Sequence, residues 1–315
     1  MKSGNVKSNT GIGPQPKSGS AFSRRMRFHQ SWYRDNVLSV PYGTGPKKND
    51  TRELGNMLDK ESGNKGLNFL TPQIFDIAKR RMEAKTGVVE PYRLLHNMLS
   101  SQPMCFNLFG PLVDDKEFAT NVFKTILPNE VEKIIEIAFE YAPDHANEYL
   151  DDRTAFDAFV KFKRPDGKGI GFIGIETKLT EPFSQVHYDS DIYRKWTERP
   201  DSPWPPNAWE KLSEIGHNQL WRDHLLAVAM TFHEHSPYAC GFFMLVRHPE
   251  DKNCTKVTKE YKKLLKSKDE SFLDYPLDEL IGVMESISQK DWLTEFKRRY
   301  LELPLSEKDW KNQTG

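Results

Sequence analysis

The sequence predicts an α/β (α+β) fold in which helices flank a small mixed sheet. Three observations predict it. Apolar residues recur with helical spacing over residues 71–142, the period changes to two over residues 155–180, and the remaining chain reads as helix, strand and helices. This order of elements is typical of proteins that pack helices against a sheet of a few strands.

The helical part of the pattern predicts four helices. Thr71 is a suitable N-cap, and Pro72 suits the first turn of a helix over residues 71–85. Further helices are expected over residues 91–101, 115–127 and 129–142. In the last of these ranges an apolar stripe supports the prediction, formed by Val131, Ile134, Ile135, Ala138 and Phe139.

Residues 155–163 and 170–180 predict two strands joined by a tight hairpin. Asp166-Gly167 between them favours a two-residue type I′ turn. With this turn at the centre, Asp157 lies opposite Glu176, and opposed residues share one side of the sheet. The other side carries an apolar set that predicts a core, namely Phe156, Ala158, Val160, Phe162, Ile173, Ile175 and Leu179.

The rest of the chain is expected to be mostly helical. A long helix over residues 207–235 precedes a buried strand over residues 238–246. Three helices then follow, over residues 255–266, 277–286 and 291–301. Residues 66–315 are therefore expected to form a single domain with a C-terminal helical extension.

Residues 1–65 are expected to form a basic, partly disordered arm. Residues 1–20 are rich in Gly, Ser, Lys and Pro, and residues 21–65 have few periodic apolar positions. The first 50 residues hold nine Lys/Arg against two Asp/Glu, so the net charge of zero is unevenly spread. Such an arm would attract phosphate, although a solvated tail explains the same charges.

Composition excludes several classes of protein. With 315 residues, 29% charged and 37% hydrophobic, the chain has the composition of a globular protein. No apolar run reaches the roughly 18 residues of a membrane span, and no apolar signal core opens the sequence. The three cysteines are scattered without metal-ligand spacing, which favours free thiols and a cytoplasmic location over a zinc site.

The sequence FIGIETKLT places Glu176 and Lys178 on the same side of a strand whose start is apolar. With Asp157 opposite, two carboxylates and one amine meet at one spot. Two such carboxylates repel unless a cation or a proton joins them, and Mg²⁺ prefers oxygen ligands of this kind. Lys178 would then orient or deprotonate a water molecule and stabilise the developing charge.

An acid two residues before a lysine also occurs elsewhere in the chain. The other pairs are Glu83/Lys85, Asp114/Lys116, Asp166/Lys168, Glu250/Lys252, Glu260/Lys262, Glu295/Lys297 and Asp309/Lys311. Most of them lie in expected helices or turns, where residues two apart diverge. An ion-paired strand face is the alternative for Glu176 and Lys178. The preceding apolar run and the register with Asp157 favour a functional site.

AFDAFV, the hairpin and IGIETKLTEPF together resemble the core of the PD-(D/E)xK nuclease superfamily, and in particular its restriction-endonuclease-like proteins. Similar segments are LLHNMLSSQPMCFNLFGPL upstream and NQLWRDHLLA downstream, so the resemblance covers about residues 65–250. It implies an αβββαβ core that cuts nucleic acid with Mg²⁺, or alternatively Mn²⁺. It also implies metal ligands at Asp157 and Glu176 and a catalytic lysine at Lys178. Phe156 replaces the proline that gives the superfamily its name.

Two further site residues follow from the resemblance. Related nucleases add a glutamate from the helix before the hairpin. Among Glu132, Glu136 and Glu140, which share one helical stripe, Glu140 is nearest to the hairpin and is the expected third metal ligand. Gln219 in NQLWRDHLLA matches a glutamine that related nucleases place near the scissile phosphate. A solvated helix face is the alternative for the glutamates, and an exposed amide is the alternative for Gln219.

The expected function is that of a cytoplasmic Mg²⁺-dependent endonuclease acting on double-stranded DNA, with restriction or defence as the expected role. Cutting both strands with one site per chain would suggest a homodimer. Two alternatives remain open from the residues. One is a nuclease acting on RNA, because contacts to the 2′-hydroxyl leave no short motif. The other is a catalytically inactive nucleic-acid-binding module.

Overall fold

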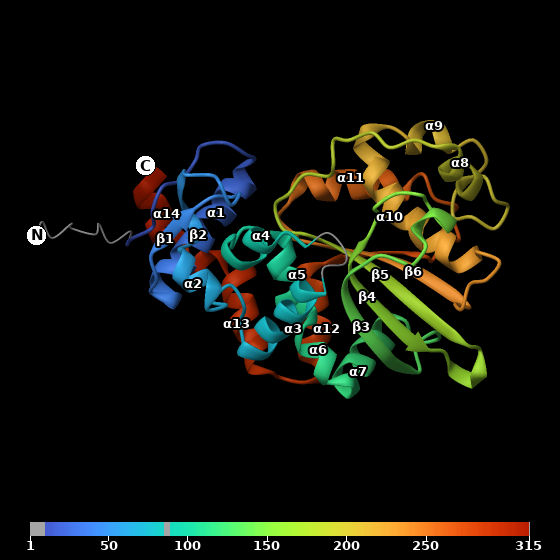
Figure 1. The fold of residues 1–315 in the computed structure, drawn as a ribbon, viewed down its shortest axis with the longest axis horizontal. Coiled ribbons are helices and arrows are strands. Elements are labelled where there is room, and N and C mark those ends of the chain that lie inside the picture. The colour runs from blue at the N-terminus through green and yellow to red at the C-terminus, as the bar shows by residue number, and fades with distance from the viewer. Residues whose placement is uncertain (1–9, 85–88, 315) are drawn as a thin grey trace, which may run out of the picture.

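The molecule is built around a five-stranded mixed sheet, which lies in the right half of Figure 1. The computed structural model describes residues 10–84 and 89–314. The strands lie in the order β3-β4-β5-β6-β7, with β3, β4 and β5 antiparallel and β5, β6 and β7 parallel. Their bounds are Lys133–Tyr141 (β3), Phe156–Lys163 (β4), Ile170–Lys178 (β5), Cys240–Arg247 (β6) and Phe272–Pro276 (β7). The predicted small mixed sheet flanked by helices is confirmed.

The β4–β5 hairpin has the register that the sequence predicts. Ala158 pairs with Ile175, and Lys163 pairs with Ile170. The turn is longer than the expected two residues, because a 3₁₀ turn spans Pro165–Gly167 and Arg164 N–H donates to Gly169 C=O at 2.9 Å. Both glycines of this connection have positive φ, which a glycine adopts without a steric penalty. The register is therefore correct although the turn type is not.

The helix expected over residues 129–142 is wrong, because this segment forms β3. Its register with β4 shifts between Ile134 and Glu136, so a bulge interrupts the alternation of buried and exposed side chains. Ile134 is buried whereas Ile135 is exposed. The bulge places apolar residues next to each other in the sequence, and this spacing imitates a helical stripe. With β3 included, the order α7, β3–β5, α10, β6 is the αβββαβ order expected.

Helices cover one face of the sheet and enclose the larger hydrophobic core. Phe106 and Phe109 from α5 pack there with Val160 and Ile173 from the hairpin. Around this core the helices are α3 (Pro72–Glu83), α4 (Pro91–His96), α5 (Ser101–Phe109), α6 (Pro111–Asp114), α7 (Lys116–Ile126), α12 (Leu277–Ile287) and α13 (Asp291–Tyr300). The helix expected over residues 91–101 ends at His96, and α5 begins at Ser101 after its N-cap Ser100.

A second core lies on the opposite face of the sheet, which is therefore packed on both sides. Phe159, Phe172 and Phe243 of the sheet meet Trp221 and Leu225 of α10 in this core. The helices here are α8 (Asp191–Thr197), α9 (Trp209–Leu212), α10 (Ile215–Phe232) and α11 (Lys252–Lys262). Phe156, expected on the side of Ala158, belongs instead to this second core.

Residues 10–65 are folded, so the expectation of an arm is wrong for them; residues 1–9 lie outside the described part. The segment forms α1 (Ala21–Tyr33), a π-helical turn (Arg34–Leu38), a hairpin of β1 (Tyr42–Thr44) and β2 (Glu53–Leu58), and α2 (Lys60–Asn64). Gln30 of α1 donates to the carbonyl of Arg299 at 2.8 Å. α14 (Glu307–Thr314) lies beside α1 in Figure 1. The segment with α1 and the last helices of the chain therefore pack against each other. Local sequence patterns do not reveal this contact.

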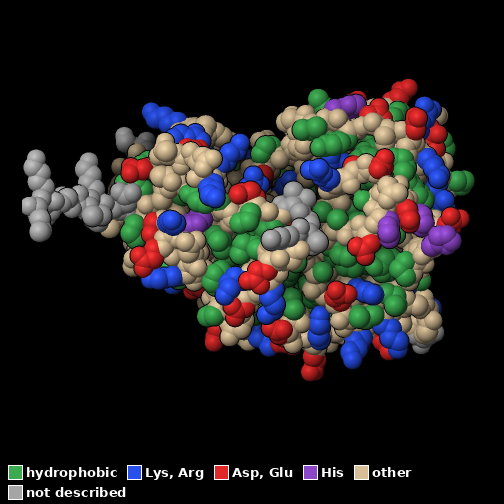
Figure 2. All heavy atoms as spheres, in the orientation of Figure 1, with side chains coloured by type: hydrophobic (Ala, Val, Ile, Leu, Met, Phe, Trp, Pro, Cys, Tyr) green, Lys and Arg blue, Asp and Glu red, His purple; other side chains and the backbone are tan. Residues whose placement is uncertain are grey.

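The visible surface carries charges of both signs. Figure 2 shows lysine and arginine intermingled with aspartate and glutamate, and a hollow at the upper centre between the part with α1 and the part with α8–α10. In the described part of the chain, no helix combines the length and the apolar character that crossing a bilayer requires.

Candidate active site

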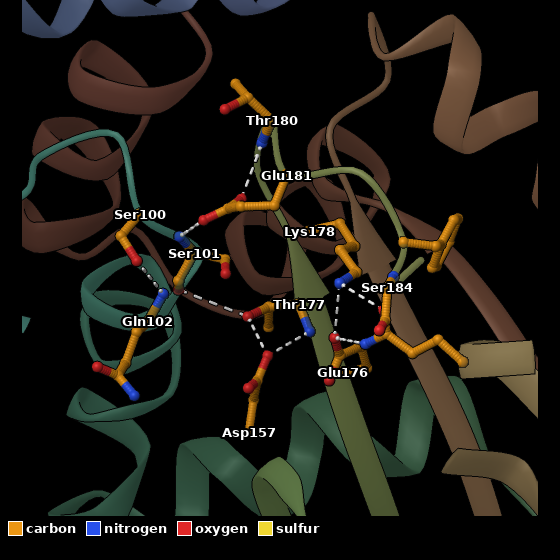
Figure 3. A network of polar contacts seen from close by, with 12 residues as sticks. Ser100, Ser101, Gln102, Asp157, Glu176, Thr177, Lys178, Thr180, Glu181 and Ser184 are labelled. Carbon is orange, nitrogen blue, oxygen red and sulfur yellow. Dashed lines mark hydrogen bonds and ion pairs between the residues drawn. The ribbon is translucent and has the colours of Figure 1, made fainter. Parts of the chain in front are cut away.

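The candidate site lies at the end of β5, in the middle of the sheet. Successive side chains of a strand point to opposite faces, so Thr177 points away from Glu176 and Lys178. Figure 3 shows Thr177 and Asp157 on one side of the β5 ribbon and Glu176 and Lys178 on the other. Thr177 faces α5, where its hydroxyl approaches the Ser101 carbonyl at 3.5 Å. The end of β5 thus places polar side chains on both faces of the sheet, and helices cover both of these faces.

Glu176, Lys178 and Gln219 form a closed triangle of contacts on the α10 side. Lys178 Nζ lies 3.0 Å from Glu176 Oε1 and donates to Gln219 Oε1 at 3.2 Å, and Gln219 Nε2 donates to Glu176 Oε1 at 2.8 Å. The side chains of Lys178 and Glu176 are only 8% and 10% exposed. Ser184 N–H also donates to Gln219 Oε1 at 2.8 Å. The structure therefore brings together three of the predicted residues, and Gln219 is not an exposed amide.

Asp157 does not form the expected face-to-face pair with Glu176. Its Oδ2 accepts from Thr177 N–H at 2.8 Å and from the Thr177 hydroxyl at 2.7 Å. The recorded pairing of β4 with β5 stops at Ala158–Ile175. Beyond that point the amide of Thr177 has lost its strand partner, and a buried N–H requires an acceptor. The carboxylate supplies it, which turns Asp157 toward the α5 side of β5.

Glu140 lies near the end of β3 and not on a helix. Its φ of 48° is unusual for a residue other than glycine. Arg81 holds the backbone here, because it donates to the carbonyls of Phe139 at 2.6 Å and of Glu140 at 2.7 Å. The carboxylate accepts from Gln102 Nε2 of α5 at 2.5 Å. The neighbouring pairs Phe139–Ala158 and Tyr141–Phe156 place Glu140 level with Asp157.

The other two glutamates of the expected stripe lie away from Glu140. Glu132 forms a surface ion pair with Lys163 at 3.2 Å, and Glu136 is exposed opposite Lys161. Because β3 is extended, residues four apart lie about 13 Å from each other along the strand, at about 3.3 Å per residue, whereas on a helix they would be neighbours. Of the three, only Glu140 is buried beside the other candidate residues.

Comparison with known proteins decides the family. A model of the PD-(D/E)XK nuclease superfamily matches residues 17–302. The chain belongs to the PD-(D/E)XK nuclease superfamily. The match includes most of the segment expected to be an arm, in line with its folded structure. Neither the curated proteins nor the solved structures contain a match.

The acidic residues of this PD-(D/E)XK protein influence one another. Burial raises the pKa of Asp157 well above its usual range, and the charges of Glu176 and Glu140 raise it further. The pKa of Glu140 is also raised, mainly by burial, with a further increase from the charge of Glu176 that the Gln102 hydrogen bond partly offsets. The three carboxylates therefore lie within electrostatic reach of one another, and their repulsion is a force that a cation would relieve.

Lys178 is held as a cation. Burial lowers its pKa, but the charge and hydrogen bond of Glu176 raise the pKa more, with contributions from Glu181 and Asp157. The net result is a pKa above the usual value for lysine. The ammonium group also lies 5.3 Å from the centre of the Phe183 ring. In this arrangement Lys178 is suited to bind and stabilise negative charge, and not to accept a proton.

The donor set has the chemistry that Mg²⁺ prefers, because all the candidate ligands are oxygen atoms. Gln102 Oε1 beside Glu140 is buried and has no hydrogen-bond partner among the described residues. In the arrangement seen, however, no group of three or more His, Cys, Asp or Glu within residues 10–84 and 89–314 is already placed to hold a metal ion. One oxygen of each carboxylate is bonded to Thr177, Gln102 or the Lys178–Gln219 pair. The residues fit a divalent cation by type. To bind one together, Asp157 and Glu176 would have to rearrange, because their side chains lie on opposite sides of β5 in Figure 3.

Sequence reasoning missed several residues that hold this site. Glu181 Oε1 accepts from Ser101 N–H at 2.7 Å, which ties the segment after β5 to the start of α5 (Figure 3). Asp223 lies one turn after Gln219 on α10, is buried, and its Oδ2 has no hydrogen-bond partner among the described residues. Burial, followed by the charge of Glu176, raises the pKa of Asp223. The spacing of four residues between Gln219 and Asp223 could have identified Asp223, because such residues share one face of a helix. No comparable sequence pattern marked Gln102 or Glu181.

Proposed function

We propose that this chain is a Mg²⁺-dependent endonuclease that hydrolyses phosphodiester bonds in DNA. The observation that carries the proposal is the buried Glu176–Lys178 pair, held at 3.0 Å by Gln219 at the end of the central strand. A buried ion pair is costly to maintain, and strongly perturbed groups of this kind concentrate at functional sites. Membership of a nuclease superfamily gives the pair its reaction class.

Asp157 and Glu176 would hold the divalent cation, with Glu140 as the third ligand. Such a cation neutralises phosphate charge and acidifies a bound water. The protein's own contribution comes from three residues. Lys178, as an ammonium, would bind the scissile phosphate and stabilise the charge that develops on it. Gln219 orients Lys178 and Glu176 through one amide group. The Ser184 N–H keeps that amide in place through its bond to Oε1.

The test is a cleavage assay on supercoiled plasmid, linear duplex DNA and single-stranded RNA, each with Mg²⁺ or with EDTA. Wild-type protein should convert supercoiled plasmid to nicked or linear forms only with Mg²⁺. Lys178→Ala should abolish this activity. Lys168→Ala is the matched control, because Lys168 is exposed at the opposite end of the same hairpin.

Each other outcome contradicts a different part of the proposal. Cleavage that persists in EDTA and in Lys178→Ala contradicts the mechanism. Cleavage of RNA alone contradicts the choice of substrate. Binding of nucleic acid without any cleavage would identify a binding module with a nuclease fold. If the wild-type protein cleaves DNA, sedimentation of the active species would show whether it is the homodimer expected for double-strand cutting.

A further inference from the structure

We propose that the exposed face of α11 binds the phosphate backbone of double-stranded DNA beside the candidate site; this inference rests on the proposed function. α11 carries Lys252, Lys256 and Lys259, and Lys263 follows as its C-cap residue. Residues spaced by three or four positions share one face of a helix, so these four lysines form one row. All four are exposed, whereas Cys254, Thr258 and Tyr261 bury the opposite face of the helix. We call this row the lysine face.

The lysine face is hollowed. A groove of about 390 Å³ is lined by its four lysines together with Pro249, Thr255 and Glu260. An adjoining cavity of about 500 Å³ also includes Lys252 and continues to Arg25 and Trp310. The groove and this cavity, which Glu250 and Asp251 also line, share Lys252 and together form one open depression on the surface.

The lysine face begins at the edge of the sheet where the candidate site lies. β5 and β6 are parallel, and Lys178 is paired with Arg247 at their ends. The N–H of His248 donates to the Lys178 carbonyl at 3.2 Å. The chain reaches Lys252 four residues later. Asp251 fixes the start of the helix by accepting from the N–H groups of Asn253 and Cys254, both at 3.0 Å. A ligand phosphate at Lys178 would thus lie at the same edge of the sheet as the start of α11.

The charges of this face are not balanced within the protein. Residues 252–263 contain five lysines and one acidic residue, Glu260. Lys262 is paired with Asp274 at 2.9 Å and lies outside the row. Within the row, the only recorded ion pair among the described residues is Lys256 with Glu260, at the limiting distance of 4.0 Å. A surface helix that serves only for solubility more often alternates its charges.

The dimensions fit a polyanion. From Lys252 to Lys263 a helix rises by about 16 Å at 1.5 Å per residue. That length corresponds to about five base steps of a DNA duplex, at 3.4 Å per step on each strand. A chain with zero net charge lacks a general attraction for DNA, so its affinity must come from a local surface of this kind.

The experiment measures binding and cleavage separately. Binding of a fluorescein-labelled 30-base-pair duplex is followed by anisotropy in EDTA over a range of KCl concentrations. The test variant carries Lys252→Gln, Lys256→Gln, Lys259→Gln and Lys263→Gln. The control variant carries four Lys→Gln substitutions at exposed lysines on other elements, namely Lys60, Lys124, Lys133 and Lys211. Circular dichroism and thermal melting establish that both variants are folded.

Wild type should show an affinity that falls steeply with salt. The test variant should lose at least about tenfold in affinity. Its log–log salt slope should be shallower by up to about 3.6, since each of the four phosphate contacts contributes about 0.9. The control variant should retain the wild-type slope. An unchanged affinity and slope in the folded test variant, or no binding of duplex DNA by wild type, overturns the inference.

Cleavage distinguishes this inference from the proposed function. If wild type binds DNA through the lysine face but cleaves no substrate, the proposed function fails and the surface stands. If wild type cleaves DNA and the test variant binds as tightly as wild type, the surface is wrong and the function stands. A test variant that loses binding only to an RNA hairpin of equal length would assign the face to RNA and overturn its assignment to DNA.

Discussion

Asp157 is bonded twice to Thr177, the residue that separates Glu176 from Lys178. The carboxylate accepts from the main-chain N–H at 2.8 Å and from the hydroxyl at 2.7 Å. The acid from one strand is therefore fixed to the middle of the Glu-x-Lys segment of the next. This contact joins the ends of β4 and β5 on the α5 side of the sheet, and several predictions concern it or the residues around it.

Thr177→Val should weaken the attachment of Asp157 while leaving its carboxyl group in place. The main-chain hydrogen bond remains, but the hydroxyl bond to a buried carboxylate is lost. Removing the partner of a buried polar group costs about 1–3 kcal/mol, so the free energy of unfolding in urea should fall by about that amount. Thr177→Ser retains the hydroxyl and should recover most of the loss. Equal stability of the valine and serine variants would show that this bond contributes nothing.

Gln219→Ala should reduce cleavage by about 10–100-fold, the usual effect of removing a residue that orients a metal ligand. The amide joins Glu176, Lys178 and Ser184. Its loss therefore leaves the side chains of Glu176 and Lys178 without the group that fixes their orientation. The loss should appear in kcat, with KM changed little. Gln289→Ala, at an exposed amide in the C-terminal part, should have no effect. A change confined to KM would instead assign Gln219 to substrate binding.

Mg²⁺ should stabilise the folded protein, because a ligand that binds only the native state shifts unfolding by mass action. We expect 10 mM Mg²⁺ to raise the melting temperature by about 2 °C or more, which corresponds to about 1 kcal/mol. EDTA should reverse the shift. Asp157→Asn combined with Glu176→Gln should abolish it, and Glu132→Gln, at a surface ion pair, should not. A full shift in the double variant would locate the cation elsewhere.

Stability should fall in mild acid because His29, His224 and His248 are buried with strongly lowered pKa values, and burial also lowers the pKa of His96. Burial lowers the pKa of His29 and His248 to about 4 and that of His224 to about 3. In the unfolded chain a histidine has a pKa of about 6.5, so between these values only the unfolded state binds the proton. The free energy of unfolding therefore decreases as pH falls below about 6.5.

The magnitude should be on the order of 2 kcal/mol per histidine between pH 6.5 and pH 5. Urea denaturation at several pH values measures it. His224→Gln should reduce the pH dependence by about a third, whereas His235→Gln, at an exposed position, should leave it unchanged. A free energy of unfolding that is constant over this window would contradict the neutral burial of these histidines.

Met26→Ala should destabilise the whole protein, although Met26 lies in the segment expected to be an arm. Met26 is fully buried and belongs to the larger hydrophobic core. Truncating a buried methionine costs about 2–5 kcal/mol, and urea denaturation should detect this in a single cooperative transition. Lys60→Ala, at an exposed position of α2, should change stability by less than about 0.5 kcal/mol. A neutral Met26→Ala would restore the view of this segment as a dispensable arm.

The sequence by itself determined the elements whose signals are local. Period-two alternation on either side of Asp166-Gly167 predicted the register of β4 and β5, and Ala158 pairs with Ile175 as expected. Capping by Thr71 marked the start of α3 correctly. The Glu-x-Lys spacing identified Glu176 and Lys178, because residues two apart in a strand must share a face.

Tertiary structure alone decided the features that depend on distant parts of the chain. β3 is a strand despite its helix-like spacing, because it completes the sheet beside β4 and its bulge hides the alternation. Asp157 turns to Thr177 because the strand pairing ends there and a buried amide needs an acceptor. Residues 10–65 are ordered because they pack against the last helices, with Gln30 bonded to Arg299 across most of the chain. Neither segment can bury its apolar face without the other. Contacts between residues so far apart produce no periodic pattern in either segment, so the sequence alone does not reveal them.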